Sequence, residues 1–266
     1  MAVVKALVEG NSIRSTVRLT GVAKNTVQEL ILELGAACAA YMDANLKNLP
    51  CKRVQCDEIW SFIGAKDKNV TAELREKNPE AGSVWTWTAI CADSKLIISC
   101  LVGGRDVGYA HAFVQDVASR LRYRVQLTTD GHRPYLAAGE DAFGADIDYA
   151  QLVKIYGASP DGERRYSPAE CIGAIPTTIT GDPNPKHIST SYVERQNLTM
   201  RMSMRRFTRL TNAFSKKIDN RVAMTALYFM YYNFGRVHQT LRVTPAMEAG
   251  VSDHVWSVEQ IVALLS

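Results

Sequence analysis

The order of strand-like and helix-like segments between residues 53 and 157 constrains the fold more than any other feature of this sequence. Stretches rich in β-branched and aromatic residues predict five strands, at 53–66, 83–93, 95–104, 124–131 and 149–157. Amphipathic periodicity predicts helices after the third and fourth strands, at 108–123 and 135–144. Strands that first follow one another and then alternate with helices indicate an α/β domain built on a mixed sheet.

This order of elements is that of the ribonuclease H-like fold, so we expect a mixed five-stranded sheet with flanking helices. Helical patterns at 191–210 and 219–235 follow the last strand. Before them, residues 157–190 contain five prolines and several glycines, which predict a long irregular insertion. We assign the catalytic domain to residues 49–215 and a C-terminal helical segment, packed on that domain, to residues 216–266.

Residues 1–48 have the pattern of a small all-α domain that precedes the sheet. Two short helices meet at a glycine turn, and the second carries apolar residues at helical spacing, as in a helix-turn-helix. A plain helical hairpin is the competing interpretation, because Ala23 stands where a capping Ser or Asn is usual. In a helix-turn-helix, the second helix would present Lys24, Asn25 and Gln28 to base edges or phosphates.

Three carboxylates stand where this plan brings separate segments together. Asp57 lies in the middle of the apolar first strand, where an ionised group is costly unless it is paired or bound to a metal. Asp130 ends the fourth strand before a glycine turn, and Glu194 opens the helix after the insertion. Glu58 competes with Asp57, and because neighbouring strand residues face opposite sides, we expect only one of the two to reach a shared site.

Each of these positions also has a purely structural interpretation. Asp130 could initiate a turn by accepting a hydrogen bond from its own backbone. Ser191 and Glu194 fit a capping box, in which the glutamate only ties down the start of a helix. His132 could contact a scissile phosphate or simply face solvent in the same turn.

Together, Asp57, Asp130 and Glu194 suit a hard divalent cation and are the expected catalytic residues. Mg²⁺ prefers oxygen ligands and keeps water or substrate phosphate in its remaining positions. Two such ions, ~3.5–4 Å apart, can activate a nucleophile and stabilise the leaving oxygen of a phosphodiester displacement. We therefore expect these carboxylates to hold two ions.

Basic residues crowd the segment that follows Glu194. Residues 195–221 contain eight Arg or Lys and one acid, which gives this segment a charge of +7 in a chain of formal net charge +4. Such density indicates an anionic partner, with nucleic acid first, although a solvated helix face is the competing interpretation. Arg201 lies two helical turns after Glu194 on the same face, ~10.5 Å along the axis, with Asn197 between them and Arg205 extending the row.

Four stretches of the sequence, in this order, resemble the DDE transposases of the insertion-sequence-one (IS-one) family. They are CDEIWSFIGAK around Asp57, TTDGHRPY around Asp130, YVERQNLTMRMSMRRFTRLTNAFSKK around Glu194, and YYNFGRVHQTLRVTPAMEAG near the end. The resemblance runs over nearly the whole chain. It implies that the three acids are a metal-binding triad using Mg²⁺ or Mn²⁺, and that Arg201 is the basic residue such enzymes place two turns after the glutamate.

The resemblance also implies an activity and partners. Such enzymes bind insertion-sequence ends, nick at terminal inverted repeats and join the freed 3′-hydroxyl ends to target DNA. We expect double-stranded DNA as the partner, a homo-oligomer on that DNA, a cytoplasmic, nucleoid-associated location in a prokaryote, and no small-molecule substrate. The expected DNA contacts are Lys24, Asn25, Gln28, Arg195, Asn197, Arg201, Arg205, Arg206 and His238.

Some alternatives stay open. His238 could instead cap carbonyls at a helix end near Pro245. The chain could be a domesticated or decayed transposase that binds DNA without cutting it, or a ribonuclease H-like nuclease acting on RNA–DNA hybrids. Family members often carry a zinc-binding CxxC pair ahead of the helix-turn-helix, whereas this sequence starts at the first helix, as expected of a truncated copy or of a lineage without that element.

Composition bears on the remaining classes of protein. No apolar run approaches 18 residues, so we expect no membrane span, and the N-terminal segment does not have the pattern of a secretory signal. The six cysteines form no CxxC pair, so we expect reduced, mostly buried thiols in a cytoplasmic protein.

Overall fold

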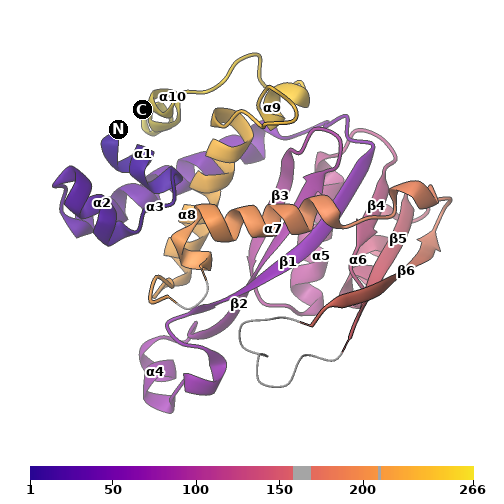
Figure 1. Ribbon diagram of the computed structural model, residues 1–266, viewed down its shortest axis with the longest axis horizontal. Helices are drawn as coiled ribbons and strands as arrows, with labels where there is room; N and C mark the ends of the chain where they lie inside the picture. The colour runs from indigo at the N-terminus through magenta and orange to yellow at the C-terminus, as the bar shows by residue number, and fades with distance from the viewer. Residues whose placement is uncertain (158–168, 209–210) are drawn as a thin grey trace.

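The computed structural model describes residues 1–157, 169–208 and 211–266 and is an α/β protein built on one mixed sheet (Figure 1). Its six strands lie in the order β3-β2-β1-β4-β5-β6. They are β1 (Arg53–Ile63), β2 (Gly82–Cys91), β3 (Ile97–Gly103), β4 (Gln126–Thr129), β5 (Asp148–Tyr156) and β6 (Cys171–Thr180). β1 pairs antiparallel with β2 and parallel with β4; β5 pairs parallel with β4 and antiparallel with β6.

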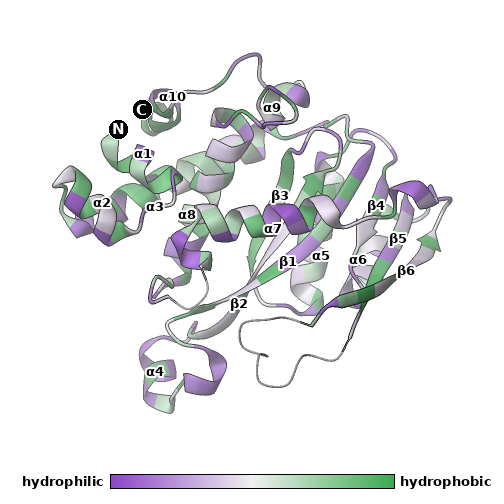
Figure 2. Cartoon of the chain, viewed as in Figure 1, coloured by the Kyte–Doolittle hydropathy of each residue, from purple (hydrophilic) through white to green (hydrophobic). Residues whose placement is uncertain are grey.

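The sixth strand corrects the prediction of a five-stranded sheet. β6 lies within the segment 157–190, which the prolines had indicated to be irregular, and residues 158–168 of that segment lie outside the described part of the chain. Pro176 is accommodated because β6 is an edge strand, where a residue without an N–H need not break the ladder. β6 exposes Ile172 and Ile175, and Figure 2 shows hydrophobic stretches along this strand.

Helices cover both faces of the sheet (Figure 1). α5 (Val107–Arg120) and α6 (Pro134–Phe143) lie behind it in this view, and α7 (Ser191–Ser203) crosses in front of it. α5 starts where the Asp106 side chain accepts the backbone N–H of Tyr109, and its buried side carries the apolar residues that its periodicity predicted. A short helix, α4 (Ala72–Lys77), follows the 3₁₀ turn Asp67–Asn69 beyond the β1–β2 end of the sheet.

The N-terminal helices pack against the C-terminal ones. α1 (Ala2–Val8), α2 (Ile13–Thr20) and α3 (Lys24–Asn45) precede the sheet. α8 (Ile218–Met230) crosses α3 so closely that a Cβ on Gly35 would lie 2.5 Å from the Ala223 Cα. Glycine is therefore required there for packing, and the division of the chain at residues 48 and 215 stays a prediction.

The remaining elements complete this helical layer. A π-helical turn (Tyr231–Gly235) extends α8, α9 (Pro245–Glu248) follows it, and α10 (Val258–Val262), near the end of the chain, lies beside α1 (Figure 1). Lys5 of α1 pairs with Glu259 of α10 at 3.0 Å. All six cysteines are free thiols, four of them buried. In the described part of the chain, no helix is long and apolar enough to cross a membrane.

Candidate active site

The register of β1 and β4 brings Asp57 and Asp130 together. Cys56 lies opposite Thr129 in this parallel pair, so the next residue of each strand emerges at the point where β4 ends. Asp130 Oδ1 accepts the backbone N–H of His132 at 3.0 Å, which is the turn that the structural interpretation predicted. Asp130 Oδ2 lies 3.9 Å from Arg105 Nη2. One oxygen of Asp130 therefore supports the turn while the other meets a charged partner.

Asp57 is held by two hydrogen bonds and sits in an acidic environment. Its Oδ1 accepts the backbone N–H of Glu58 at 2.8 Å, and its Oδ2 accepts from Asn197 Nδ2 of α7, also at 2.8 Å. Burial raises the pKa of Asp57 to about 7, and the nearby charges of Glu58 and Asp130 add to this shift. Asn197 Oδ1 is buried without a hydrogen-bond partner in the described structure.

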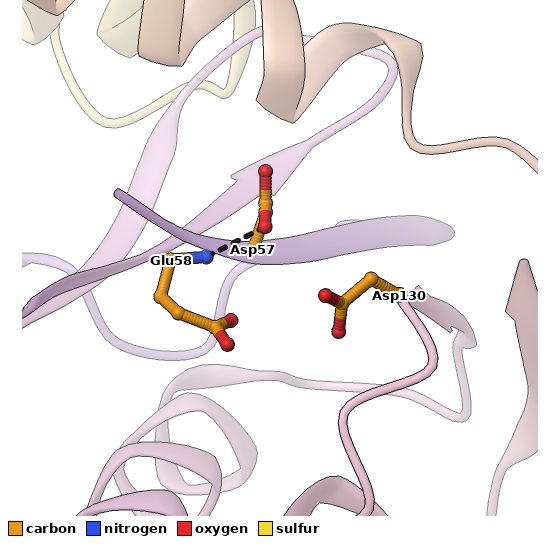
Figure 3. A group of neighbouring side chains, drawn as sticks. All are labelled: Asp57, Glu58 and Asp130. Atoms are coloured by element: carbon orange, nitrogen blue, oxygen red, sulfur yellow. Dashed lines mark hydrogen bonds between the residues drawn. The ribbon is translucent and has the colours of Figure 1, made fainter. Parts of the chain in front are cut away.

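Glu58 reaches the same group from the other side of β1. Figure 3 shows Asp57 and Glu58 leaving the strand in opposite directions, with the Asp130 carboxylate beside them. One carboxylate oxygen from each of the three acids lies within 4.8 Å of the other two, so Asp57, Glu58 and Asp130 could hold a metal ion. The expectation that only one of the adjacent acids reaches the shared site is therefore wrong. Asp130 lies at the end of β4, where side chains from both faces of β1 can reach its carboxylate.

Glu58 nevertheless has a different environment from Asp57. Its side chain is fully buried, and its two oxygens accept hydrogen bonds from Arg105 Nε at 2.6 Å and Tyr135 OH at 3.1 Å. Burial, then the charge of Asp130, raises the pKa of Glu58, while Arg105 opposes the shift. Arg105 lies 4.5 Å from the centroid of the Trp85 ring, and this stacking fixes the guanidinium between Glu58 and Asp130.

Glu194 enters the site because β1 anchors the start of α7. The buried Gln55 side chain accepts the backbone N–H groups of Tyr192 and Val193 at 2.8 and 3.2 Å. Gln55 precedes Asp57 by two residues and so shares its face of the strand. An acceptor from the sheet thus takes the place of a local cap and sets Glu194 beside Asp57.

The capping box predicted from Ser191 and Glu194 does not form. α7 begins at Ser191 with Thr190 as its N-cap, and no N-cap side-chain bond to the helix backbone is present among the described residues. The Glu194 carboxylate accepts hydrogen bonds from Thr190 Oγ1 and Lys154 Nζ instead. Burial lowers the pKa of Lys154, but the hydrogen bond and charge of Glu194 outweigh it, so the net pKa is raised.

We expect Gln55→Leu to lower the free energy of unfolding by ~1–3 kcal/mol, because two N–H groups at the helix start, of which that of Val193 is buried, lose their acceptor. Urea denaturation at neutral pH measures this change. Gln239→Leu, at an exposed position, should change stability by less than ~0.5 kcal/mol. Equal stability of Gln55→Leu and the natural chain would show that solvent or another group caps α7.

An open pocket of about 720 Å³ unites these segments. Its lining includes three acids and three bases: Asp57, Asp130, Glu194, Arg105, Arg133 and Lys154. A smaller adjoining hollow is lined by Asp57, Glu194, Asn197 and Arg201, among others. The predicted catalytic residues therefore line one pocket, but in the described part of the chain Glu194 is not a member of the compact acidic group.

Sequence reasoning missed the three basic residues of the pocket, Arg105, Arg133 and Lys154. Lys154 is a charged residue within the strand β5, the same signal that identified Asp57 in β1. Arg105 follows the two glycines that end β3, where nothing in the local pattern distinguishes it from an ordinary surface arginine. Only the sheet order brings its guanidinium to Glu58 and Asp130.

The basic segment is less uniformly exposed than its sequence suggests. Arg195 and Arg205 are exposed, and Arg201 is half-buried in the smaller hollow. Arg206 points inward, where its guanidinium donates to the Asn220 carbonyl and to Ser215 Oγ, and burial lowers its pKa to about 10. The geometry therefore does not favour the predicted DNA contact of Arg206.

Arg221, at the end of the basic segment, also lies in the interior. It is completely buried, with its guanidinium 4.2 Å from the centroid of the Phe207 ring. Burial, then the charge of Arg206, lowers the pKa of Arg221 to about 9. Two of the basic residues of the segment 195–221 thus lie in the protein interior and are not available to an anionic partner.

The other predicted DNA contacts lie apart from the pocket lining. Lys24 and Asn25 are exposed at the start of α3, and Gln28 is half-buried one turn later. His238 follows the π-helical turn, where its Nδ1 lies 3.1 Å from Thr240 Oγ1. His132, by contrast, lines the pocket, and its ring lies against Trp87 and Tyr135, with centroid distances of 5.8 and 5.9 Å.

Comparison with known proteins gives a distant structural likeness. No protein-family model matches the sequence, and no curated protein matches it. The chain is similar to the piggyBac transposase in a cryo-EM synaptic complex with hairpin DNA, with a TM-score of 0.38 and 10% identity over 81% of this chain and 52% of that one. The chain thus spans about half the length of that transposase chain. A likeness at this level establishes neither fold nor function, and the IS-one resemblance stays a hypothesis.

Proposed function

We propose that the chain is a DDE-type transposase, a metal-dependent enzyme that cuts DNA at insertion-sequence ends and joins the freed ends to a target. The observation that carries this proposal is the position of Asp57, Asp130 and Glu194 around one open pocket, although they come from β1, the end of β4 and the first turn of α7. The strand order β3-β2-β1-β4-β5, with helices on both faces, supports a ribonuclease H-like catalytic domain.

The donor atoms of the pocket fit a hard divalent cation. We assign Asp57, Asp130 and Glu194 as the residues that hold Mg²⁺ or Mn²⁺, with two ions in the active complex, because carboxylate oxygens are the ligands such ions prefer. When bound, such ions supply an activated nucleophile and stabilise charge on the leaving oxygen. Glu58 is assigned a supporting role, since its side chain is fully buried, is paired with Arg105 and does not line the larger pocket.

Basic residues around the pocket supply contacts for DNA. The exposed Arg195 and Arg205, together with Arg201 beside Glu194, would follow the phosphate backbone of the strand to be cut. Lys24, Asn25 and Gln28 of α3 would contact the terminal inverted repeats, and His238 and Asn197 complete the predicted set. The partners are then double-stranded DNA at the element ends and at the target, bound by a homo-oligomer.

The deciding experiment compares the natural chain with Glu194→Gln in a Mg²⁺-dependent cleavage and strand-transfer assay. The substrates are duplexes that end in the inverted repeats flanking the gene, with a scrambled duplex as the control. We expect the variant to cut at least ~10³-fold more slowly, because losing a metal ligand removes several kcal/mol of transition-state stabilisation. Its affinity for the duplex should stay within ~3-fold of the natural chain.

Glu140→Gln is the matched control, since it removes a negative charge from an exposed position on α6 that does not line the pocket. It should cut at the natural rate. If the natural chain and Glu194→Gln bind the ends equally and neither cuts, the chain is a DNA-binding protein without catalysis. Preferential cutting of an RNA–DNA hybrid would favour the nuclease alternative.

A further inference from the structure

Both carboxylate oxygens of Glu194 are engaged by other side chains of the protein. Its Oε1 accepts a hydrogen bond from Thr190 Oγ1, and its Oε2 is paired with the ammonium of Lys154. Within the described residues, the acids that already lie within 4.8 Å of one another are Asp57, Glu58 and Asp130. The proposed triad is thus partly assembled, with Glu194 engaged elsewhere.

Lys154 reaches Glu194 from a neighbouring part of the sheet. β4 ends at Thr129, opposite Gln151, so Lys154 lies on the part of β5 that continues past the end of β4. It lies on the same face of β5 as Leu152 and Tyr156, two residues away on either side, which also line the pocket. The Lys154 and Glu194 side chains are 28% and 37% exposed to solvent, so water and ions can reach the pair.

We propose that Lys154 is a positioning residue that holds Glu194 in the metal-free protein, and that a divalent cation displaces its ammonium group on binding. The inference rests on the proposed function, in which Glu194 is a metal ligand. An ammonium beside a carboxylate oxygen opposes the approach of a divalent cation to that oxygen, since like charges at such distances repel in a partly buried pocket.

The exchange couples metal binding to DNA binding. Once Glu194 turns to the ion, the Lys154 ammonium remains in the pocket without its carboxylate partner and is available to a phosphate of the bound strand. A phosphate that takes up this ammonium frees Glu194 in turn. By linkage, DNA and metal then favour each other's binding by the same factor.

The test measures Mn²⁺ affinity of the full chain without DNA, by isothermal titration and by the EPR signal of free Mn²⁺. It uses the natural chain, Lys154→Met, Glu194→Gln and the double variant. We expect Lys154→Met to tighten Mn²⁺ binding about tenfold, because the competing cation is gone. In the Glu194→Gln background, the same change should have less than a twofold effect, because Lys154 acts through that carboxylate.

Lys77→Met is the matched control, since Lys77 also pairs with a glutamate, Glu73, but lies on α4 and does not line the pocket. It should leave Mn²⁺ affinity unchanged, and thermal unfolding followed by circular dichroism checks that each variant is folded. If Lys154→Met tightens binding equally in both backgrounds, the lysine acts only through its general charge and the inference is overturned. It is also overturned if Lys154→Met leaves Mn²⁺ affinity unchanged or weaker.

The same titrations separate this inference from the proposed function. A weaker Mn²⁺ affinity of Glu194→Gln than of the natural chain supports Glu194 as a ligand, whatever Lys154→Met does. If Glu194→Gln binds Mn²⁺ as well as the natural chain, the assignment of Glu194 in the proposed function fails, and the role of Lys154 fails with it.

Discussion

We expect Asp57→Asn to lower Mg²⁺-dependent DNA cleavage by at least ~10³-fold, and Glu58→Gln to lower it by less than ~10-fold. The two acids are adjacent in sequence and both lie in the compact acidic group. Asp57 lines the open pocket with Asp130 and Glu194. The oxygens of Glu58 are already occupied by Arg105 and Tyr135, and a glutamine there can still accept from Arg105.

Initial cleavage rates on the inverted-repeat duplex, at saturating protein and with binding measured separately, check this difference. Glu140→Gln again serves as the control for loss of one negative charge. Equal and severe loss in Asp57→Asn and Glu58→Gln would mean that both acids hold the ion, as their proximity allows. Loss in Glu58→Gln alone would contradict the assignment of Asp57.

A second large effect is expected on stability rather than on activity. Asp57→Asn should stabilise the metal-free protein at pH 8. In the natural chain the buried Asp57 carboxylate is ionised at this pH, which lowers the stability of the folded state. The shift in pKa from 3.8 to about 7 corresponds to up to ~4 kcal/mol at ~1.4 kcal/mol per unit. At ~2–4 °C per kcal/mol for a chain of this size, the unfolding midpoint should rise by several degrees.

The dependence on pH has a definite sign. Folding raises the pKa of Asp57, so between pH 3.8 and about 7 the folded protein keeps a proton that the unfolded chain has released. The contribution of Asp57 to stability therefore falls as pH rises through this window and is constant above it. The advantage of Asp57→Asn should be absent near pH 4, grow with pH, and level off above pH 7.

Thermal unfolding in EDTA at several pH values measures this effect. The asparagine fits the site because Asn197, whose Oδ1 lacks a partner, can turn its amide and accept from the new side-chain N–H. Asp146→Asn, at an exposed position, is the control and should show no such trend. A constant difference between Asp57→Asn and the natural chain from pH 4 to 8 would show that ionisation of the buried Asp57 carboxylate is not the cause. The expected gain is that of a buried charge kept at the cost of stability, as the proposed function of Asp57 requires.

Local patterns predicted the elements and several of their details. Stretches rich in β-branched and aromatic residues located β1 to β5, and helical periodicity located α5 and α8. An acidic pair in an apolar strand identified Asp57, with Glu58 as its competitor, and an acid at a strand end identified Asp130. These signals are local because strand and helix periods, turn residues and misplaced charges are properties of short stretches.

What only the tertiary structure decided depends on neighbours that are distant in sequence. Pairing with β5 makes β6 a strand in spite of Pro176, and a side chain of β1, Gln55, caps α7 in place of the predicted capping box. The sequence by itself determined that acids and bases are present and on which elements they lie. The sheet order and the packing of α7 decided which charges meet. They direct Arg206 inward and bring Lys154 to Glu194, because ion pairs form between side chains that the fold places within a few ångströms, whatever their separation along the chain.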